Sequence, residues 1–407
     1  MTSFLAVILR SPADRRDEEE SRDPSWSLRN KAARLTIERT TILSASDKIS
    51  SDLGEIQGRL AASRRMFGLG LLALALMSFV SILAATGLGR LHFPWRTVVA
   101  ALGEGLGLYP SGTVERTPLV VVFGIRLSRV VLSFLVGAAL GLAGAVFQGI
   151  LRNPLADPFT IGVASGAAFG AALAFTLGLG GGSYLGLGTI PLLALLGALG
   201  ALVLVMTMGQ VQGRMRRDTL VLAGIVVATF LSALIALIKA LDEEAVSAIV
   251  FWVMGSFQGR GWIHVGFTLP YLLIGLYLVL SRARELDILT LGEVQARQLG
   301  IEVERVRNRL LVGASLLTAA AVSVSGVIGF VGLVIPHLVR MVMGASHQRL
   351  MVLSAFIGGL ALVWSDVVAR ILLPGGEELP VGVVTAIVGG PFFCLLLKRG
   401  RGGVILD

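Results

Sequence analysis

The chain has 407 residues, of which 55% are hydrophobic and only 15% are charged. This is too little charge to cover a soluble protein of the same size, and the mean hydropathy of +0.82 fits a membrane protein. Apolar stretches of about 20 residues recur along the chain, which indicates several membrane-spanning helices rather than the ~10-residue alternating segments of a membrane barrel.

The region 1–60 differs in kind from the rest of the chain. It holds ten basic and ten acidic residues, and its stretch SPADRRDEEESRDPSW has no apolar face, which is typical of a disordered segment. The formal net charge of +9 therefore lies entirely within 61–407. We expect a disordered cytoplasmic extension at 1–60, a transmembrane domain at 61–402 and a short tail at 403–407.

About ten membrane segments follow the extension. They lie near 66–87, 127–150, 159–178, 190–209, 219–240, 262–280, 305–325, 329–344, 351–372 and 382–397. Arginine and lysine gather in every second connection, which predicts that both ends of the chain are cytoplasmic. The connection 88–129 is an exception, because it carries five arginines on the opposite side. The predicted fold is an all-α polytopic membrane protein with its N- and C-termini inside.

The motifs of several enzyme classes are missing. None of the four lysines follows a glycine, so there is no phosphate-binding P-loop, and the four histidines show no metal-ligand spacing. No Gly-x-Ser-x-Gly motif is present. We expect a chain that is not an enzyme and that needs no metal or cofactor of its own. Its basic excess fits cytoplasmic loops rather than a nucleic-acid partner.

The stretch RNPLADP, at 152–158, interrupts two long apolar runs. Each of its two prolines removes a backbone donor and disfavours helix in the residue before it, so the stretch predicts a rigid break on the cytoplasmic side. One interpretation is an ordinary polar turn between two helices. The other is a constriction or gate at the cytoplasmic mouth of a pore.

The segment LGEVQARQLGIEVERVRNR, at 291–309, is too polar to cross a membrane. It predicts two short helices broken at Gly300, with a charged surface. A solvated loop is one interpretation, and a docking element for a cytoplasmic partner is the other.

Three arginines lie near the predicted outer ends of segments. Arg126 and Arg129 share a helical face and are expected to point outward, where they could attract an acidic soluble partner. Arg370 lies one helical turn after Asp366, so a structural ion pair is the alternative for that arginine.

From about residue 66 to residue 402 the chain resembles the FecCD-type permeases of bacterial ABC importers, which take up ferric siderophores, haem and cobalamin. The matching stretches are RLSRVVLSFLVGAALGLAGAVFQGILRNPLADPFTIGVASGA, LVLAGI, FWVMGSFQGRGW, LGEVQARQLGI, GFVGLVIPHLVR, SDVVAR and ELPVGVVTAIVGGPFF. The resemblance covers the whole predicted membrane portion and leaves out residues 1–60.

The resemblance implies a dimer of ten-helix permeases of the type II importer architecture in the bacterial inner membrane. It also implies two cytoplasmic ATPase subunits and an extracytoplasmic substrate-binding protein as partners, and a path for the substrate between the two permeases. The expected substrate is a metal chelate, with a ferric siderophore as the default and haem or cobalamin as the other members of the class. A homodimer is expected, although a pair of different permeases is also known in such systems.

The resemblance also assigns roles to residues. The cytoplasmic gate comprises Asn153, Pro154 and Leu155, and the binding-protein docking site comprises Arg126, Arg129 and Arg370. Coupling to the ATPase falls on the helix pair near 292–303, at Gly292, Glu293, Ala296, Arg297, Leu299 and Gly300. A second gate loop falls on Arg217, Asp218 and Thr219.

The second gate loop departs from the family pattern. Small hydroxyl residues often precede the LxLAG stretch in these permeases, whereas this chain has the run Arg216-Arg217-Asp218-Thr219.

Two other functions compete with the importer. A secondary transporter would need an ionisable residue near the membrane midplane, but Lys239 and Asp366, the charges well inside segments, both lie toward outer ends. An intramembrane enzyme would need a catalytic constellation that the sequence does not show.

Overall fold

The computed structural model describes residues 28, 31, 36, 58, 62, 65–179, 183–184, 187–211, 214–344, 346–374 and 377–400. The predictions of a disordered extension at 1–60 and a tail at 403–407 therefore fall outside the described residues, apart from four isolated positions. Contacts divide the chain into two units, 1–73 and 74–407. The elements and sites described below belong to the second unit, except that the first long helix begins in the first.

The described residues confirm the prediction of an all-α polytopic fold. Seven helices are long and apolar enough to cross a membrane. They are Arg65–Gly87, the continuous helix Arg116–Leu151, α7 (Thr189–Met208), α8 (Arg217–Leu241), α10 (Trp262–Leu280), α13 (Val303–Ser325) and α15 (His347–Ile371). Three shorter apolar helices are α6 (Val163–Thr176), α14 (Val331–Met343) and α16 (Val381–Gly400). Each coincides with one of the ten predicted segments.

Short elements connect these helices. They are α3 (Trp95–Gly105), the 3-10 helix η2 (Pro158–Ile161), α9 (Glu243–Val253), α11 (Ala283–Leu291), α12 (Glu293–Gln298), and the hairpins β1 (Ser183–Tyr184) with β2 (Leu187–Gly188) and β3 (Gln210–Val211) with β4 (Arg214–Met215). The helix Arg116–Leu151 itself consists of α4 (Arg116–Leu119), a π-helical stretch η1 (Val120–Leu127) and α5 (Ser128–Leu151). The hairpins each pair only two residues per strand, so helices dominate the described fold.

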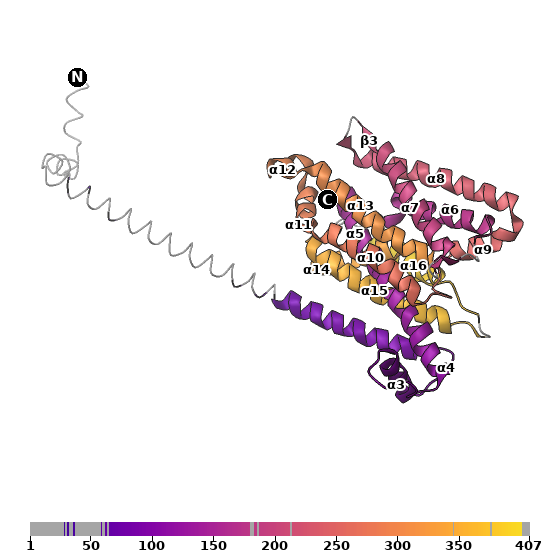
Figure 1. Ribbon diagram of the computed structural model, residues 1–407. Coiled ribbons are helices and arrows are strands. Elements are labelled where there is room, and N and C mark those ends of the chain that lie inside the picture. The colour runs from indigo at the N-terminus through magenta and orange to yellow at the C-terminus, as the bar shows by residue number, and fades with distance from the viewer. Residues whose placement is uncertain are drawn as a thin grey trace, which may run out of the picture. The chain divides into compact units, whose positions relative to one another are not determined.

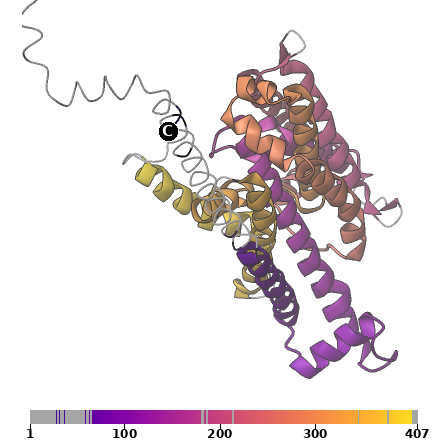
Figure 2. The same cartoon turned by 90° about the vertical axis from the view of Figure 1, so that its left-hand side faces the viewer.

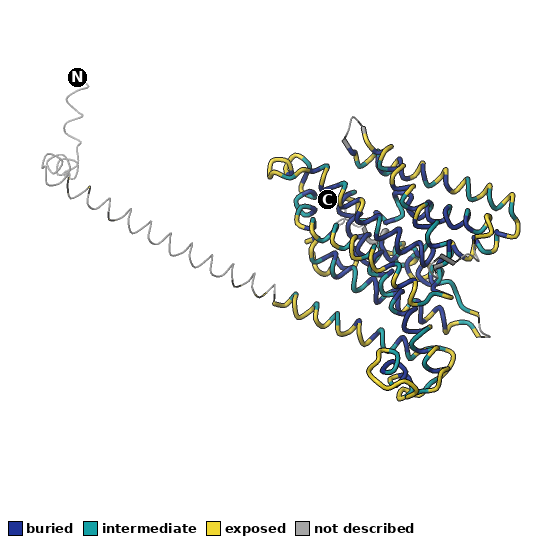
Figure 3. The backbone as a smooth tube through the Cα atoms, viewed as in Figure 1, coloured by how far each residue is buried: buried dark blue, intermediate teal, exposed yellow. Residues whose placement is uncertain are grey.

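The core is built around α5, which packs most extensively against α15 and also against α13 and α14. In Figure 3 much of α5 and α13 is drawn as buried. Small residues allow this close packing, as the spacing in 137–149 suggests. A Cβ atom added to Gly144 would lie 1.8 Å from the carbonyl oxygen of Gly332 on α14, and one on Gly137 would lie 2.3 Å from that of Gly358 on α15. The backbone of α5 can approach those of α14 and α15 this closely only because Gly144 and Gly137 have no side chain.

The stretch 325–340 is divided between a short loop and a short helix. Gly326 has φ 72° and ends α13, and Phe330 has φ 69° immediately before α14 begins. Pro336 lies inside α14, which is only 13 residues long. The extended stretch between the two helices explains why this segment is shorter than its neighbours.

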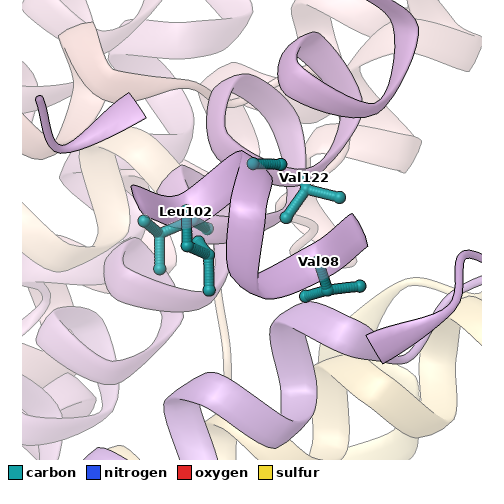
Figure 4. Close-up of a cluster of buried hydrophobic side chains, with 5 residues drawn as sticks. Val98, Leu102 and Val122 are labelled. Carbon is teal, nitrogen blue, oxygen red and sulfur yellow. The ribbon is translucent and has the colours of Figure 1, made fainter. Parts of the chain in front are cut away.

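The second unit has two distinct ends. Figure 1 shows α11, α12 and β3 at one end and α3 and α4 at the other, and Figure 2 shows the same separation after a quarter turn. At the α3 end, Val98 and Leu102 pack with Val122 of η1 in a small apolar cluster (Figure 4). We call the first the α12 end and the second the α3 end. By the distribution of arginine and lysine, the α12 end is the predicted cytoplasmic end.

Candidate functional site

The RNPLADP stretch forms a tight turn at the end of α5. Arg152 has φ 49° and ends the helix, which is a left-handed conformation that a non-glycine residue seldom adopts. The backbone N–H of Asn153 donates to the carbonyl of Gln148 at 3.2 Å, and the Asn153 side-chain oxygen accepts from the N–H of Leu155 at 2.9 Å. Asparagine thus supplies a local acceptor where the chain has left the helix. The turn is built by its own residues.

Asp157 then starts the next element. Its carboxylate accepts from the N–H of Phe159 at 2.8 Å, and the Thr160 hydroxyl oxygen accepts from the backbone N–H of Asp157 at 3.1 Å, which completes a reciprocal capping box over η2. Burial raises the pKa of Asp157 to about 6, and the hydrogen bond from the Phe159 N–H opposes that rise. The carboxyl group therefore has a fixed structural task as a helix cap.

The predicted gate residues lie at the surface of this turn. Asn153 and Leu155 are exposed, and Pro154 is half-buried. The Arg152 guanidinium donates to the carbonyl of Leu289 in α11. The turn therefore lies at the α12 end of the unit.

The predicted coupling residues divide into two groups. Ala296 and Gly292 are buried and anchor α12, whereas Arg297, Leu299 and Gly300 are exposed. Glu293, the first residue of α12, is half-buried and faces a group of arginines. The predicted break at Gly300 is confirmed, because α12 ends at Gln298, Gly300 has φ 80° and α13 begins at Val303. Only the first of the two helices in 291–309 is short, since the second is the start of the long helix α13. A further break, at Gly292 with φ 148°, separates α11 from α12.

Two exposed apolar residues beside these positions were not predicted. Leu291 is 68% exposed and Val294 is 62% exposed, and they flank Leu299, which is 64% exposed. Three large apolar side chains in the open on short polar helices are typical of a surface that a partner covers. These three apolar residues stand out in a mostly polar segment of the sequence, so their positions could have predicted this surface.

The second predicted gate loop lies next to α12. Arg217 is the first residue of α8, Asp218 is exposed and Thr219 is half-buried. The Arg217 guanidinium lies 3.5 Å from the Glu293 carboxylate. The structure thus brings together the second gate loop and the predicted coupling helix, which are 76 residues apart in the chain.

The three predicted docking arginines lie together at the α3 end. Arg129 contacts the carboxylates of Asp366 and Glu378, each at 2.8 Å. Arg370 pairs with Asp366 at 3.1 Å, so the structural alternative for this pair is confirmed. Arg126 donates to the carbonyls of Gly87, at 3.2 Å, and Leu91, at 2.6 Å. Its guanidinium also lies 5.5 Å from the centre of the Phe93 ring.

The expectation that Arg126 and Arg129 point outward does not match their burial. Arg126, Arg129 and Arg370 are only 5–6% exposed. In this structure the arginine side chains donate hydrogen bonds to backbone carbonyls and form ion pairs with two carboxylates, the buried Asp366 and the half-buried Glu378. The carboxylates also explain how positive charge is tolerated at this end against the positive-inside rule. Direct docking through these three side chains stays a prediction that no contact in the structure tests.

A cavity of about 530 Å³ lies between α6, α8 and α9. Most of its lining is apolar, with Ser165 and Ser232 as polar groups. Among the described residues that line it, Lys239 is the one charged side chain. A second hollow of about 440 Å³ shares Val253 and Met254 with it and continues to α16.

Comparison with known proteins places these features in a family. The model of the FecCD transport family matches residues 74–399, which is most of the chain. The chain belongs to the FecCD transport family. Within the family, the chain is 42% identical over 327 residues to the ABC transporter permease YvrB of Bacillus subtilis. The match covers 80% of this chain and 92% of that relative. The cobalamin import permease BtuC of Halobacterium salinarum is 41% identical over 310 residues, or 76% of this chain and 80% of that one.

Another family member is a ferric citrate permease. FecD of Escherichia coli, a permease of the Fe(3+) dicitrate transport system, is 36% identical over 337 residues, which cover 81% of this chain and 99% of that one. A solved structure of a protein described as a metal-chelate type ABC transporter, in an inward-facing conformation, matches with a TM-score of 0.69 and 33% identity. That match covers 81% of this chain and 98% of the other. The chain is thus a membrane-spanning permease subunit of an ABC importer, as its resemblance implied.

Proposed function

We propose that this FecCD-family permease carries a metal chelate across the bacterial inner membrane and is driven by a separate ATPase. The relatives named for cobalamin and ferric dicitrate and the solved metal-chelate type transporter support a chelate as the substrate. A ferric siderophore is our default within that class, with haem and cobalamin as the alternatives. In this proposal ATP hydrolysis takes place in the partner, and the chain itself holds no cofactor.

The observation that carries the proposal is the exposed apolar surface of the α11–α12 segment. Leu291, Val294 and Leu299 lie in the open beside the exposed Arg297. A soluble ATPase can drive a membrane protein only through a rigid element that it grips, and a short helix with apolar contacts provides such an element. We propose that α12 seats in a groove of the ATPase and transmits its movement.

The same end carries the proposed gate. Because the Arg152 side chain contacts the Leu289 carbonyl, movement of α11 reaches the turn that presents Asn153 and Leu155. In this proposal Asn153, Pro154 and Leu155 narrow the cytoplasmic mouth of the path. The paired turn of a second copy would complete the constriction, so we propose a homodimer.

The cavity beside α8 is our candidate for part of the path. A mostly apolar wall with a few polar groups is typical of cavities that accept small-molecule ligands. Lys239, half-buried at its rim, would favour a chelate with net negative charge.

We propose that an extracytoplasmic binding protein docks at the α3 end. Because Arg126, Arg129 and Arg370 are buried, their part in docking is to hold the shape of this end. The arginines available to acidic groups of the partner are Arg96 and Arg116, which are exposed. Docking through them would weaken as salt is raised.

The test is reconstitution. The chain is purified with the ATP-binding subunit that accompanies it and placed in liposomes with candidate binding proteins loaded with ferric siderophore, haem or cobalamin. ATP-driven uptake that depends on one loaded protein supports the proposal and identifies the substrate. A chain that purifies alone and takes up substrate under an ion gradient would contradict it in favour of a secondary transporter.

A further inference from the structure

The proposed second gate loop begins with a long basic side chain. Arg217 is the first residue of α8 and closely follows the β3–β4 hairpin. An arginine with a long side chain can reach an element that serine or threonine cannot. The structure shows which element it reaches.

Glu293, the first residue of α12, is the centre of a charged cluster. Its carboxylate lies 3.5 Å from the Arg217 guanidinium and 3.6 Å from that of Arg297, and it also contacts Arg307 of α13. One carboxylate therefore meets three guanidinium groups from three elements. A single negative charge surrounded in this way holds them together, because without it the arginines would repel one another.

Glu304 provides a second connection between the same elements. Its carboxylate accepts from the backbone N–H of Met215 at 3.3 Å and lies 3.8 Å from Arg307 and 3.9 Å from Arg297. Arg307 in turn donates to the Met215 carbonyl and is almost fully buried. The hairpin that leads into α8 is thereby attached to α13.

The exposure of the cluster suits a contact that forms and breaks. The Arg217 side chain is 21% exposed and that of Glu293 is 35% exposed. Separating such a pair costs little, since water can solvate both groups. Arg307, at 3% exposed, is the fixed side of the cluster, whereas Arg217 is the side that can release.

We propose that the Arg217–Glu293 ion pair is a latch that ties the second gate loop to the coupling helix in this chain. While the pair is formed, it holds the start of α8 against α12. When the ATPase displaces α12, the pair separates and frees the start of α8, while the Arg152 contact to α11 moves the first gate. Arg217 is a positioning residue, because it acts on the gate through Glu293 and touches no substrate. This inference rests on the proposed function, since it needs a partner that moves α12.

The experiment uses the full-length chain reconstituted with its ATP-binding subunit and binding protein. The variants are Arg217→Ser, which removes the guanidinium, Glu293→Gln, the double variant, and Arg217→Lys, which keeps the charge. The matched control is Glu302→Gln, which removes an exposed ion pair with Arg305, at 2.8 Å, from the same segment. The readouts are chelates imported per ATP hydrolysed, with whichever of ferric citrate, haem and cobalamin the wild type imports, and the thermal midpoint of the purified complex.

We expect Arg217→Ser and Glu293→Gln each to lower the ratio of import to hydrolysis about threefold to tenfold. The double variant should be no worse than Glu293→Gln alone, because the Arg217 contact is already lost in that single variant. Arg217→Lys should keep most of the ratio, and Glu302→Gln all of it. Thermal midpoints of Arg217→Ser and the wild type should agree, which separates a lost latch from a damaged fold.

Two results would overturn the latch. One is an unchanged ratio in Arg217→Ser, and the other is an additive loss in the double variant. A wild-type complex that hydrolyses ATP without any import, or that imports without ATP, would instead refute the proposed function, so the two failures are distinguishable.

Discussion

Replacing Arg129 by methionine should strongly destabilise the α3 end of the permease. The substitution keeps a long, helix-compatible side chain but removes the guanidinium that contacts Asp366 and Glu378, each at 2.8 Å. Asp366 is completely buried, so its carboxylate would depend on Arg370 alone. Removing one partner of a buried pair costs about 3–5 kcal/mol, and the remaining arginine places the expected loss near the lower limit, at about 3 kcal/mol.

The assay is unfolding of the purified chain in mixed detergent micelles, followed by helical circular dichroism. Asp366→Asn and the double variant complete a cycle with Arg129→Met. Because each single variant already removes the Arg129–Asp366 contact, the loss in the double variant should fall short of the sum of the single losses by about 1 kcal/mol or more. Arg96→Met is the control, since this exposed arginine at the same end should change stability by less than about 0.5 kcal/mol.

A stability of Arg129→Met equal to that of the wild type would refute the reasoning. It would mean that Arg129 does not need its internal partners and is available to a partner protein. In that case, a loss of affinity for the binding protein in the stable variant would restore direct docking as its role.

Three further predictions concern the core, the cavity and the gate. Gly144→Ala should cost about 2–3 kcal/mol, because its Cβ would overlap the Gly332 carbonyl, whereas Gly200→Ala, with open space around it, should be neutral in the same unfolding assay. Lys239→Met should lower import of anionic ferric citrate or haem severalfold more than import of cobalamin, and equal effects on all three would contradict a role in charge selection. Asp157→Asn should keep the helix cap and gain stability only at higher pH. The pKa of Asp157 is raised to about 6, so the stability that the protonated group contributes is complete below about pH 4 and is lost as the pH rises through 6. The gain above pH 7 should reach at most about 3 kcal/mol, and melting curves at pH 5 and pH 8 measure it; a gain that is the same at both pH values would speak against the raised pKa.

The membrane segments could be predicted from the sequence because hydrophobicity is a local property. A stretch such as 219–240 reveals a helix without knowledge of its neighbours, and the structure places α8 at Arg217–Leu241. The close packing of α5 could be anticipated in the same way, because glycines at regular spacing mark one face of a helix. What the spacing did not show was the partner of each glycine, such as Gly332 for Gly144.

The ion pairs could not be predicted, because their partners are far apart in the chain. Arg129 and Glu378 are separated by 249 positions, and a single sequence contains nothing that links them. The prediction that Arg129 faces outward rested on its position in one helix. The sequence did not show that Glu378, in the stretch after α15, lies beside it. The pair Asp366 and Arg370 was predictable, because it lies within one turn of one helix.

The two charged clusters differ in a way that fits their places in a transporter. At the α3 end, Asp366 is completely buried and Arg129 is nearly so, and charges that cannot reach water are costly to separate. At the α12 end, Glu293 remains one-third exposed and its contacts to Arg217 and Arg297 are longer, so water can replace them at small cost. In the proposed mechanism, movement driven by the ATPase would therefore separate contacts near α12 while the cluster around Asp366 stays closed.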